Sequence, residues 1–152
     1  MSAMTPDPTI TARVQQIFAD APFLDLLGIV LTGAGDGWCE TSLAVHDRLL
    51  QQHGFVHAGA ITTLADHTCG GAARASLGDD RDVITIEFKI NFLKPAKARR
   101  LEGRGVALRS GRTIVAAESE VFSVDEDRRE LVAKCLSTLA VIPRGRPNGD
   151  AR

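Results

Sequence analysis

A single carboxylate, Asp66, lies in a long stretch of the sequence without other Asp, Glu, Lys or Arg residues. This stretch runs from Arg48 to Arg74, and most of its residues are apolar or small. A buried carboxylate is costly unless it is paired or hydrogen-bonded, and a solvated helix usually has several charged side chains. Asp66 is therefore a candidate functional group, and a surface or locally hydrogen-bonded Asp is the structural alternative.

Residues 57–77 predict the helix on which this carboxylate lies, because the segment is too long and too rich in small residues for a strand. Such a helix spans about 30 Å. Gly54 lets the backbone turn before it, so that His57, Ala58 and Gly59 lie at its N-terminus. Free backbone N–H groups and the helix dipole there can stabilise the oxyanion that forms when a carbonyl is attacked.

Asp66 lies too far along this helix to meet those N–H groups in the same chain. It follows His57 by nine residues, which corresponds to about 13 Å along the axis. In a symmetric dimer with antiparallel helices, the Asp66 of one subunit can lie beside the helix start of the other. The sequence therefore predicts an active site that is shared between two copies of the chain.

Three other sequence patterns resemble known functional motifs but lack the context that those motifs require. The Gly-rich stretch 33–37 is followed by a strand pattern and not by the helix that a dinucleotide-binding loop must open, so we expect a hairpin turn there. His53 and His57 would share a face only within a helix, which Gly54 disfavours, so no metal site is expected. GxSxG and SxxK are absent from the sequence, and no neighbour in the sequence activates Cys69 as a nucleophile.

A basic cluster surrounds the end of one predicted strand and the start of the next. It could be a charged sheet edge that prevents aggregation, or a docking surface for a ligand with phosphate groups. The residues alone favour neither interpretation. The cluster consists of Lys89, Lys94, Lys97, Arg99, Arg100 and Arg104.

The remaining elements predict an α+β fold, in which the long helix lies on a curved sheet and its small residues allow close contact. We expect a first helix from about Thr9 to Asp20 and a final antiparallel meander of four strands. In the first strand of that meander, five apolar residues alternate with polar ones, which predicts one buried and one wetter face. These five are Ile84, Ile86, Phe88, Ile90 and Phe92. The strands are expected at Leu27–Thr32, Trp38–Val45, 83–92, Arg100–Arg109, Arg112–Val124 and Leu131–Ile142.

Composition indicates one ordinary soluble domain. The chain has 152 residues, 24% of them charged and 44% apolar, and a net charge of −1. This charge does not favour nucleic acid or an anionic membrane as a partner, and no apolar run approaches the roughly 20 residues of a membrane helix. Three widely spaced cysteines predict reduced thiols and a cytoplasmic protein. Residues 1–8 and 143–152 are expected to be disordered, which leaves 9–142 as the domain.

Two segments, HGFVHAGAITTLADHTCGGAA at 53–73 and ITIEFKINFLKPA at 84–96, resemble the hotdog-fold acyl-CoA thioesterases of the phenylacetic-acid-degradation type. The most specific part is the family's His-Gly-Gly pattern, which reads His57-Ala58-Gly59 here, with an acidic residue nine positions after the His. The resemblance covers roughly residues 24–142. It implies a central helix wrapped by an antiparallel sheet, and a homodimer or a dimer of dimers in which two subunits join their sheets.

The resemblance also implies roles for individual residues. Asp66 matches the catalytic carboxylate, which acts as a general base toward water or as a nucleophile. The N–H of Ala58, helped by Gly59, matches the donor that polarises the thioester carbonyl, although most members have Gly at position 58. His57 matches the histidine that supports the helix start, and Gln51 matches an Asn or Gln that orients the thioester or the attacking water.

The expected reaction is the hydrolysis of an acyl-CoA, aryl or short- to medium-chain, to a carboxylate and CoA, without a metal or organic cofactor. Gly70 lies where some members have a hydroxyl residue near the substrate. We expect the basic cluster, in particular Lys89, Lys94, Arg99 and Arg100, to meet the phosphates of CoA. Two alternatives stay open: a hotdog enoyl-CoA hydratase or dehydratase that uses His57 or His67, and an acyl-CoA-binding protein without turnover.

Overall fold

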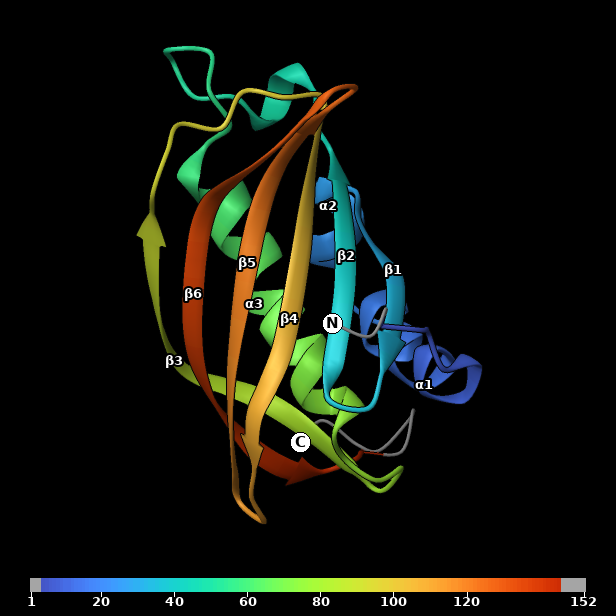
Figure 1. The fold of residues 1–152 in the computed structure, drawn as a ribbon. Helices are drawn as coiled ribbons and strands as arrows, with labels where there is room; N and C mark the ends of the chain where they lie inside the picture. Colours follow the sequence, from blue (N-terminus) through green and yellow to red (C-terminus); the bar gives the residue numbers. More distant parts are fainter. Residues whose placement is uncertain (1–3, 146–152) are drawn as a thin grey trace.

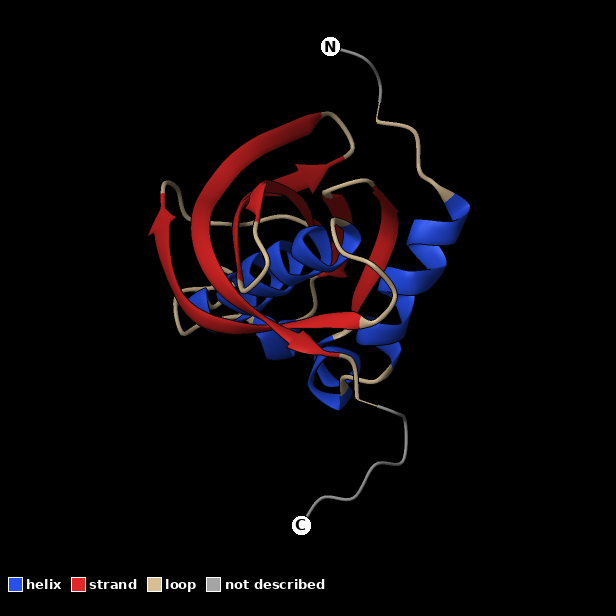
Figure 2. Ribbon diagram, turned by 90° about the horizontal axis from the view of Figure 1, so that it is seen from below, coloured by secondary structure: helices blue, strands red, loops and turns tan. Residues whose placement is uncertain are grey.

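The computed structural model describes residues 4–145 and has one curved antiparallel sheet around a long helix (Figure 1). Seen from below, the strands curl around α3, and the two N-terminal helices lie on the side that the sheet leaves open (Figure 2). This confirms the expected α+β hotdog architecture. The elements are α1 (Pro8–Ala19), α2 (Pro22–Leu27), β1 (Ile29–Gly35), β2 (Trp38–Ala44), a 3-10 turn (Asp47–Leu49), α3 (Ala58–Ala75), β3 (Arg81–Phe92), β4 (Arg100–Ser110), β5 (Ile114–Asp125) and β6 (Arg128–Pro143).

The strand order in the sheet is β1-β2-β4-β5-β6-β3. The expected meander of four consecutive strands is therefore wrong: only β4, β5 and β6 form one, and β3 pairs with β6 at the edge. Residues 93–99 connect β3 to β4 across two intervening strands, or about 14 Å at the usual strand spacing. Seven residues can span about 23 Å, so the crossing is sterically simple.

The N-terminal part differs from the expectation in two places. Asp7, rather than Thr9, caps α1, and its carboxylate accepts hydrogen bonds from the N–H groups of Thr9 and Ile10 at 2.8 and 3.0 Å. The short helix α2 precedes β1 and ends at Gly28, whose φ of 81° is readily adopted by glycine. Six helical residues are too few for a recognisable periodic pattern, so the sequence did not reveal α2.

The folded part begins and ends slightly outside the predicted range 9–142. Residues 1–3 and 146–152 lie outside the described residues. Within the described part, residues 7–8 already belong to the cap and first turn of α1, and β6 continues to Pro143. The turn expected at 33–37 is present, since Gly35 pairs with Trp38 and leaves Asp36 and Gly37 as the hairpin loop.

The close packing of α3 on the sheet depends on small residues on both sides. A Cβ atom added at Gly105 of β4 would lie 2.6 Å from the backbone oxygen of Thr68 in α3. A Cβ atom added at Gly71 of α3 would lie 2.5 Å from the Sγ atom of Cys39 in β2. The expectation that small residues let the helix approach the sheet is thus confirmed.

We expect Gly105→Ala to lower the free energy of unfolding by about 1–3 kcal/mol, because the methyl group can be accommodated only if α3 moves away from β4. Chemical denaturation monitored by circular dichroism measures this change. Gly70→Ala is the control, since a Cβ atom there meets no other atom within 4 Å. The control should be neutral or more stable by up to about 1 kcal/mol, and equal losses in both variants would contradict the packing argument.

Strand β3 contains a β-bulge between Thr85 and Glu87 that divides its apolar pattern. The five alternating apolar residues were expected to share one buried face, and this is wrong. Ile84 and Ile86 are 57% and 56% exposed, whereas Ile90 packs against the core. The extra residue of a bulge reverses which side chains point to each face, so the alternation continues in the sequence but not in space.

Candidate active site

The N-terminus of α3 begins at a cap formed by His57. The His57 Nδ1 atom accepts a hydrogen bond of 2.9 Å from the N–H of Gly59. The preceding turn is possible because Gly54 adopts a φ of 80°. Within residues 4–145, no group accepts a hydrogen bond from the N–H of Ala58. Of the two predicted oxyanion donors, Ala58 is therefore free and Gly59 is already bound to His57.

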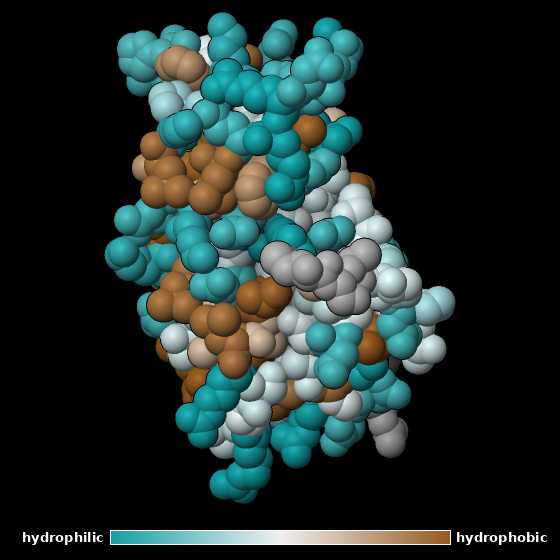
Figure 3. All heavy atoms as spheres, in the orientation of Figure 1, coloured by the Kyte–Doolittle hydropathy of each residue, from teal (hydrophilic) through white to brown (hydrophobic). Residues whose placement is uncertain are grey.

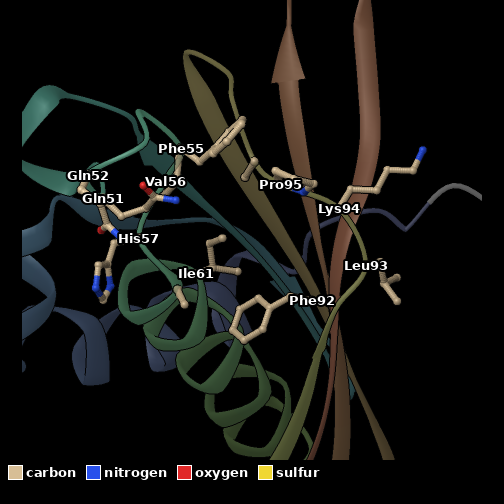
Figure 4. A pocket seen from close by; sticks show the side chains of 12 residues that line it. Gln51, Gln52, Phe55, Val56, His57, Ile61, Phe92, Leu93, Lys94 and Pro95 are labelled. Carbon is tan, nitrogen blue, oxygen red and sulfur yellow. The ribbon is translucent and has the colours of Figure 1, made fainter.

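A cavity of about 640 Å³ opens beside Ala58, between the start of α3 and the end of β3. Its lining is mostly apolar, and Figure 4 shows Ile61 and Phe92 next to each other, with Phe55 and Pro95 nearer the loop before α3. Gln51 also lines this cavity, but its side-chain oxygen accepts a hydrogen bond from the N–H of His53. The cavity thus combines an apolar wall with one free N–H group.

Asp66 lies about 12 Å further along α3, eight residues after Ala58. The hydroxyl of Thr85 on β3 donates a hydrogen bond of 2.9 Å to Asp66 Oδ1. Burial raises the pKa of Asp66 above its usual value, and the hydrogen bond from Thr85 opposes this change. The carboxylate is thus partly desolvated and lies against β3.

A second cavity of about 280 Å³ adjoins Asp66, and it shares no residue with the cavity beside Ala58. Gly70 lies on its wall, in keeping with its predicted place near Asp66, together with Val83 and Thr85 of β3. In one chain the structure therefore keeps the carboxylate and the free N–H apart, as the helix geometry predicted.

His67 and Cys69 follow Asp66 within three positions of the sequence but lack the surroundings of catalytic groups. Burial lowers the pKa of His67 to about 4, and its ring packs edge-to-face on Phe18 at 4.7 Å. Its Nε2 atom is buried and has no hydrogen-bond partner among the described residues. The Cys69 thiol is buried, and its pKa is raised by a hydrogen bond to Cys135 and by desolvation, so it stays protonated.

The basic residues that were predicted as one cluster are separated in the structure. Most of them form ion pairs with acidic neighbours: Lys94 with Glu130, Arg99 with Glu126, Arg100 with Glu102, and Arg104 with Glu40. Arg100 and Arg104 line a cavity on β2 and β4, and Lys89 of β3 donates to Asn91.

Of the predicted basic cluster, Lys94 lines the first cavity, and Lys97 lines cavities next to it. A neighbouring cavity of about 420 Å³ is lined by both lysines and by Arg128, and it shares Phe55, Lys94 and Pro95 with the cavity beside Ala58. Arg128 was not predicted, because it comes from β6 and is distant in sequence from the lysines. Thr85 was not predicted either, since the alternating pattern assigns it to the wetter face of its strand.

Two absences hold for residues 4–145. No helix in this range is long and apolar enough to cross a membrane. The same range has no group of three or more His, Cys, Asp or Glu side chains arranged to hold a metal ion.

Comparison with known proteins gives the family. Residues 53–130 match the model of the thioesterase superfamily. A thioesterase family protein from Silicibacter pomeroyi is 31% identical, with a TM-score of 0.85, over 89% of this chain and 99% of that chain. A 1,4-dihydroxy-2-naphthoyl-CoA hydrolase from Listeria monocytogenes is 25% identical over 118 residues, which are 77% of this chain and 93% of that protein.

Proteins of lower sequence identity have the same fold. The PaaI protein from the phenylacetic acid degradation operon of E. coli is 18% identical, with a TM-score of 0.77, over 88% of this chain and 96% of that chain. At this identity the likeness extends to the fold alone. The family match and the closely superimposable structure from Silicibacter pomeroyi lead to one conclusion: this chain belongs to the thioesterase superfamily and is a thioester hydrolase.

Proposed function

We propose that the chain hydrolyses acyl-CoA thioesters as a homodimer, or a dimer of dimers, of the phenylacetic-acid-degradation type. The observation that supports this most is the separation of two complementary groups on one helix. The free N–H of Ala58 and the carboxylate of Asp66 border different cavities of the same chain. Each is half of a site for cleaving a thioester, and a second copy in antiparallel orientation supplies the other half.

The free edge of β3 supports a dimer through this strand. β3 has 12 residues and is a terminal strand of the sheet. Figure 3 shows apolar side chains gathered on the side of the molecule where β3 and β6 lie. Phe88, Phe92 and Leu93 are 40%, 48% and 51% exposed. Monomeric proteins usually protect an edge strand with charge, proline or a covering element, so an apolar edge favours pairing with a second copy.

In such a dimer, the Ala58 N–H of one subunit and the Asp66 carboxylate of the other carry out the hydrolysis together. The thioester carbonyl lies at the N–H of Ala58, which stabilises the oxyanion as the carbonyl is attacked. Asp66 of the other subunit takes a proton from the attacking water, or attacks the carbonyl itself to form a mixed anhydride that water then cleaves. The CoA thiolate leaves without a strong general acid, because a thiol is far more acidic than an amine.

The lining of the larger cavity favours an apolar acyl group, and the relative that acts on 1,4-dihydroxy-2-naphthoyl-CoA makes an aryl group a useful first substrate. The hydratase and dehydratase alternative has less support, because His67 is buried against Phe18 and its Nε2 atom makes no hydrogen bond to a described residue.

Thiol release from a panel of aryl and straight-chain acyl-CoAs tests this proposal, with sedimentation velocity to determine the oligomeric state. We expect thiol release and at least a dimer. A loss of enoyl absorbance without thiol release would indicate a hydratase. Stoichiometric acyl-CoA binding without turnover would indicate a binding protein, and a purely monomeric active enzyme would contradict the shared site.

We propose that the phosphates of CoA bind near Lys97, Lys94 and Arg128 rather than along the whole predicted cluster. Lys97 lines the cavity of about 420 Å³ and has no ion-pair partner among the described residues. Lys97→Ala is therefore expected to raise KM by about two- to fivefold, the usual size of an exposed ionic interaction, with kcat unchanged. Steady-state kinetics at low salt measures this.

The matched control for Lys97→Ala is Lys89→Ala. Lys89 lies opposite the exposed Leu136 on the outer face of the sheet and donates to Asn91. We expect its removal to leave KM unchanged. The reverse result, with an effect of Lys89→Ala alone, would assign the phosphates to the outer face of β3.

A further inference from the structure

Thr85 makes the one side-chain hydrogen bond that Asp66 accepts within residues 4–145. Its hydroxyl lies 2.9 Å from Asp66 Oδ1, although the two residues are 19 positions apart and belong to different elements. The other oxygen, Oδ2, accepts no hydrogen bond from a described residue, so it stays available for a water molecule or a thioester. We infer that Thr85 is a positioning residue, which orients the Asp66 carboxylate for the reaction; this inference rests on the proposed function.

The β-bulge explains why a hydroxyl group, and not an aliphatic side chain, faces Asp66. Beyond the bulge, Ile90 and Phe92 pair with the buried residues Cys135 and Ala133 and point toward the helix. Strict alternation from these two would direct the even-numbered residues Ile84 and Ile86 to the same face. The shift of register between Thr85 and Glu87 changes this, and Thr85 pairs with the buried Leu139 instead. Bulges commonly re-aim a side chain next to an active site.

The hydrogen bond acts on the carboxylate in two ways. It restricts rotation of the Asp66 carboxyl group, which keeps Oδ2 in a constant direction. It also stabilises the ionised form, the form that can accept a proton or attack a carbonyl, against the desolvation that raises the pKa of Asp66. Both effects require the hydroxyl group of Thr85 and not its methyl group.

Other titratable groups surround Asp66 on the elements packed against it. The ring of His67 is neutral at physiological pH, because burial lowers its pKa to about 4. These groups are the same in wild type and in a Thr85 variant, so a comparison of the two isolates the hydroxyl. They are Asp20 after α1, His67 and Cys69 on α3, Asp82 on β3 and Cys135 on β6.

Thr85→Val and Thr85→Ser test the inference, because Val keeps the β-branched shape without the hydroxyl and Ser keeps the hydroxyl. In Thr85→Val we expect the acid limb of kcat/KM to move upward by about one pH unit. On the alkaline plateau kcat should fall about tenfold, because the carboxylate is no longer held. Thr85→Ser should stay close to wild type in both respects. An unchanged acid limb in Thr85→Val, or equal losses in both variants, would overturn the inference.

A titration that does not depend on activity separates this inference from the proposed function. The pKa of Asp66, followed through its carboxyl carbon by NMR, should be higher in Thr85→Val than in wild type and unchanged in Thr85→Ser. If wild type cleaves no acyl-CoA, the proposed function fails while this titration still tests the hydrogen bond. Equal pKa values would overturn the role of Thr85 even in an active enzyme. If Thr85→Val does not fold, Thr85→Ala is expected to show the same rise.

Discussion

Asp66→Asn is expected to lower kcat for thioester hydrolysis by about 10³-fold or more, whichever of its two roles the carboxylate has. Asn has nearly the same volume as Asp, but it neither accepts a proton from water nor attacks a thioester at a useful rate. Thiol release with the best substrate of the panel, at saturating concentration, measures the change. A loss of less than about tenfold would assign the reaction to another group.

The stability of Asp66→Asn serves as its control. Burial raises the pKa of Asp66 in the folded state, so this residue stabilises the fold at low pH, and that contribution is lost as the pH rises through the folded pKa. At neutral pH the ionised, partly desolvated carboxylate lowers the free energy of unfolding, and Asn removes this destabilisation. The variant should therefore have an equal or higher Tm than wild type at pH 7. A lower Tm together with a loss of dimer would mean that inactivity reflects misfolding.

Isotope labelling distinguishes the two roles of the carboxylate. If Asp66 is the nucleophile and water cleaves the anhydride at the Asp carbonyl, turnover in H₂¹⁸O places label in Asp66. If Asp66 is a general base, the oxygen of water enters only the product acid. Mass spectrometry of the peptide that contains Asp66, after turnover in labelled water, would therefore identify a nucleophile by its gain of label.

Mixed dimers of Asp66→Asn and Ala58→Pro are expected to regain activity that neither variant has alone. In such a heterodimer, one site has the Asp66 of the Ala58→Pro subunit and the Ala58 N–H of the Asp66→Asn subunit, and the other site lacks both groups. A purified heterodimer should thus have about half of the wild-type kcat per dimer. Each homodimer should show the loss of about 10²-fold or more that follows removal of an oxyanion donor or a base.

The substitution Ala58→Pro suits this experiment because of where Ala58 lies. It is the first residue of α3, where a proline is tolerated and only one N–H group is lost. His57 before it has φ and ψ of −62° and 138°, which a following proline accepts. Ala58→Gly, which keeps the N–H, is the matched control and should remain active. Heterodimers without activity, formed from two folded variants, would mean that the site is not shared between subunits.

Local features of the sequence determined the central part of this protein. The predicted helix at 57–77 corresponds to α3 at Ala58–Ala75, because a long run of small and apolar residues without Pro specifies a helix through neighbouring residues alone. The isolation of Asp66 in that run marked it as a residue with a special environment. The offset between Asp66 and the helix start follows from the rise of a helix per residue, so the proposal of a site shared by two chains could also be made from the sequence.

Only the tertiary structure decided what faces Asp66 and which charges lie together. β3 pairs with β6 at the edge of the sheet, and the bulge after Thr85 brings the hydroxyl to Asp66. The lysines near the cavities come together with Arg128 from β6, while their sequence neighbour Arg100 lies elsewhere. Strand pairing and register depend on contacts between distant residues, and one extra residue in a strand reverses its faces. The sequence therefore determined the helix and its carboxylate, and the fold determined the partners of that carboxylate.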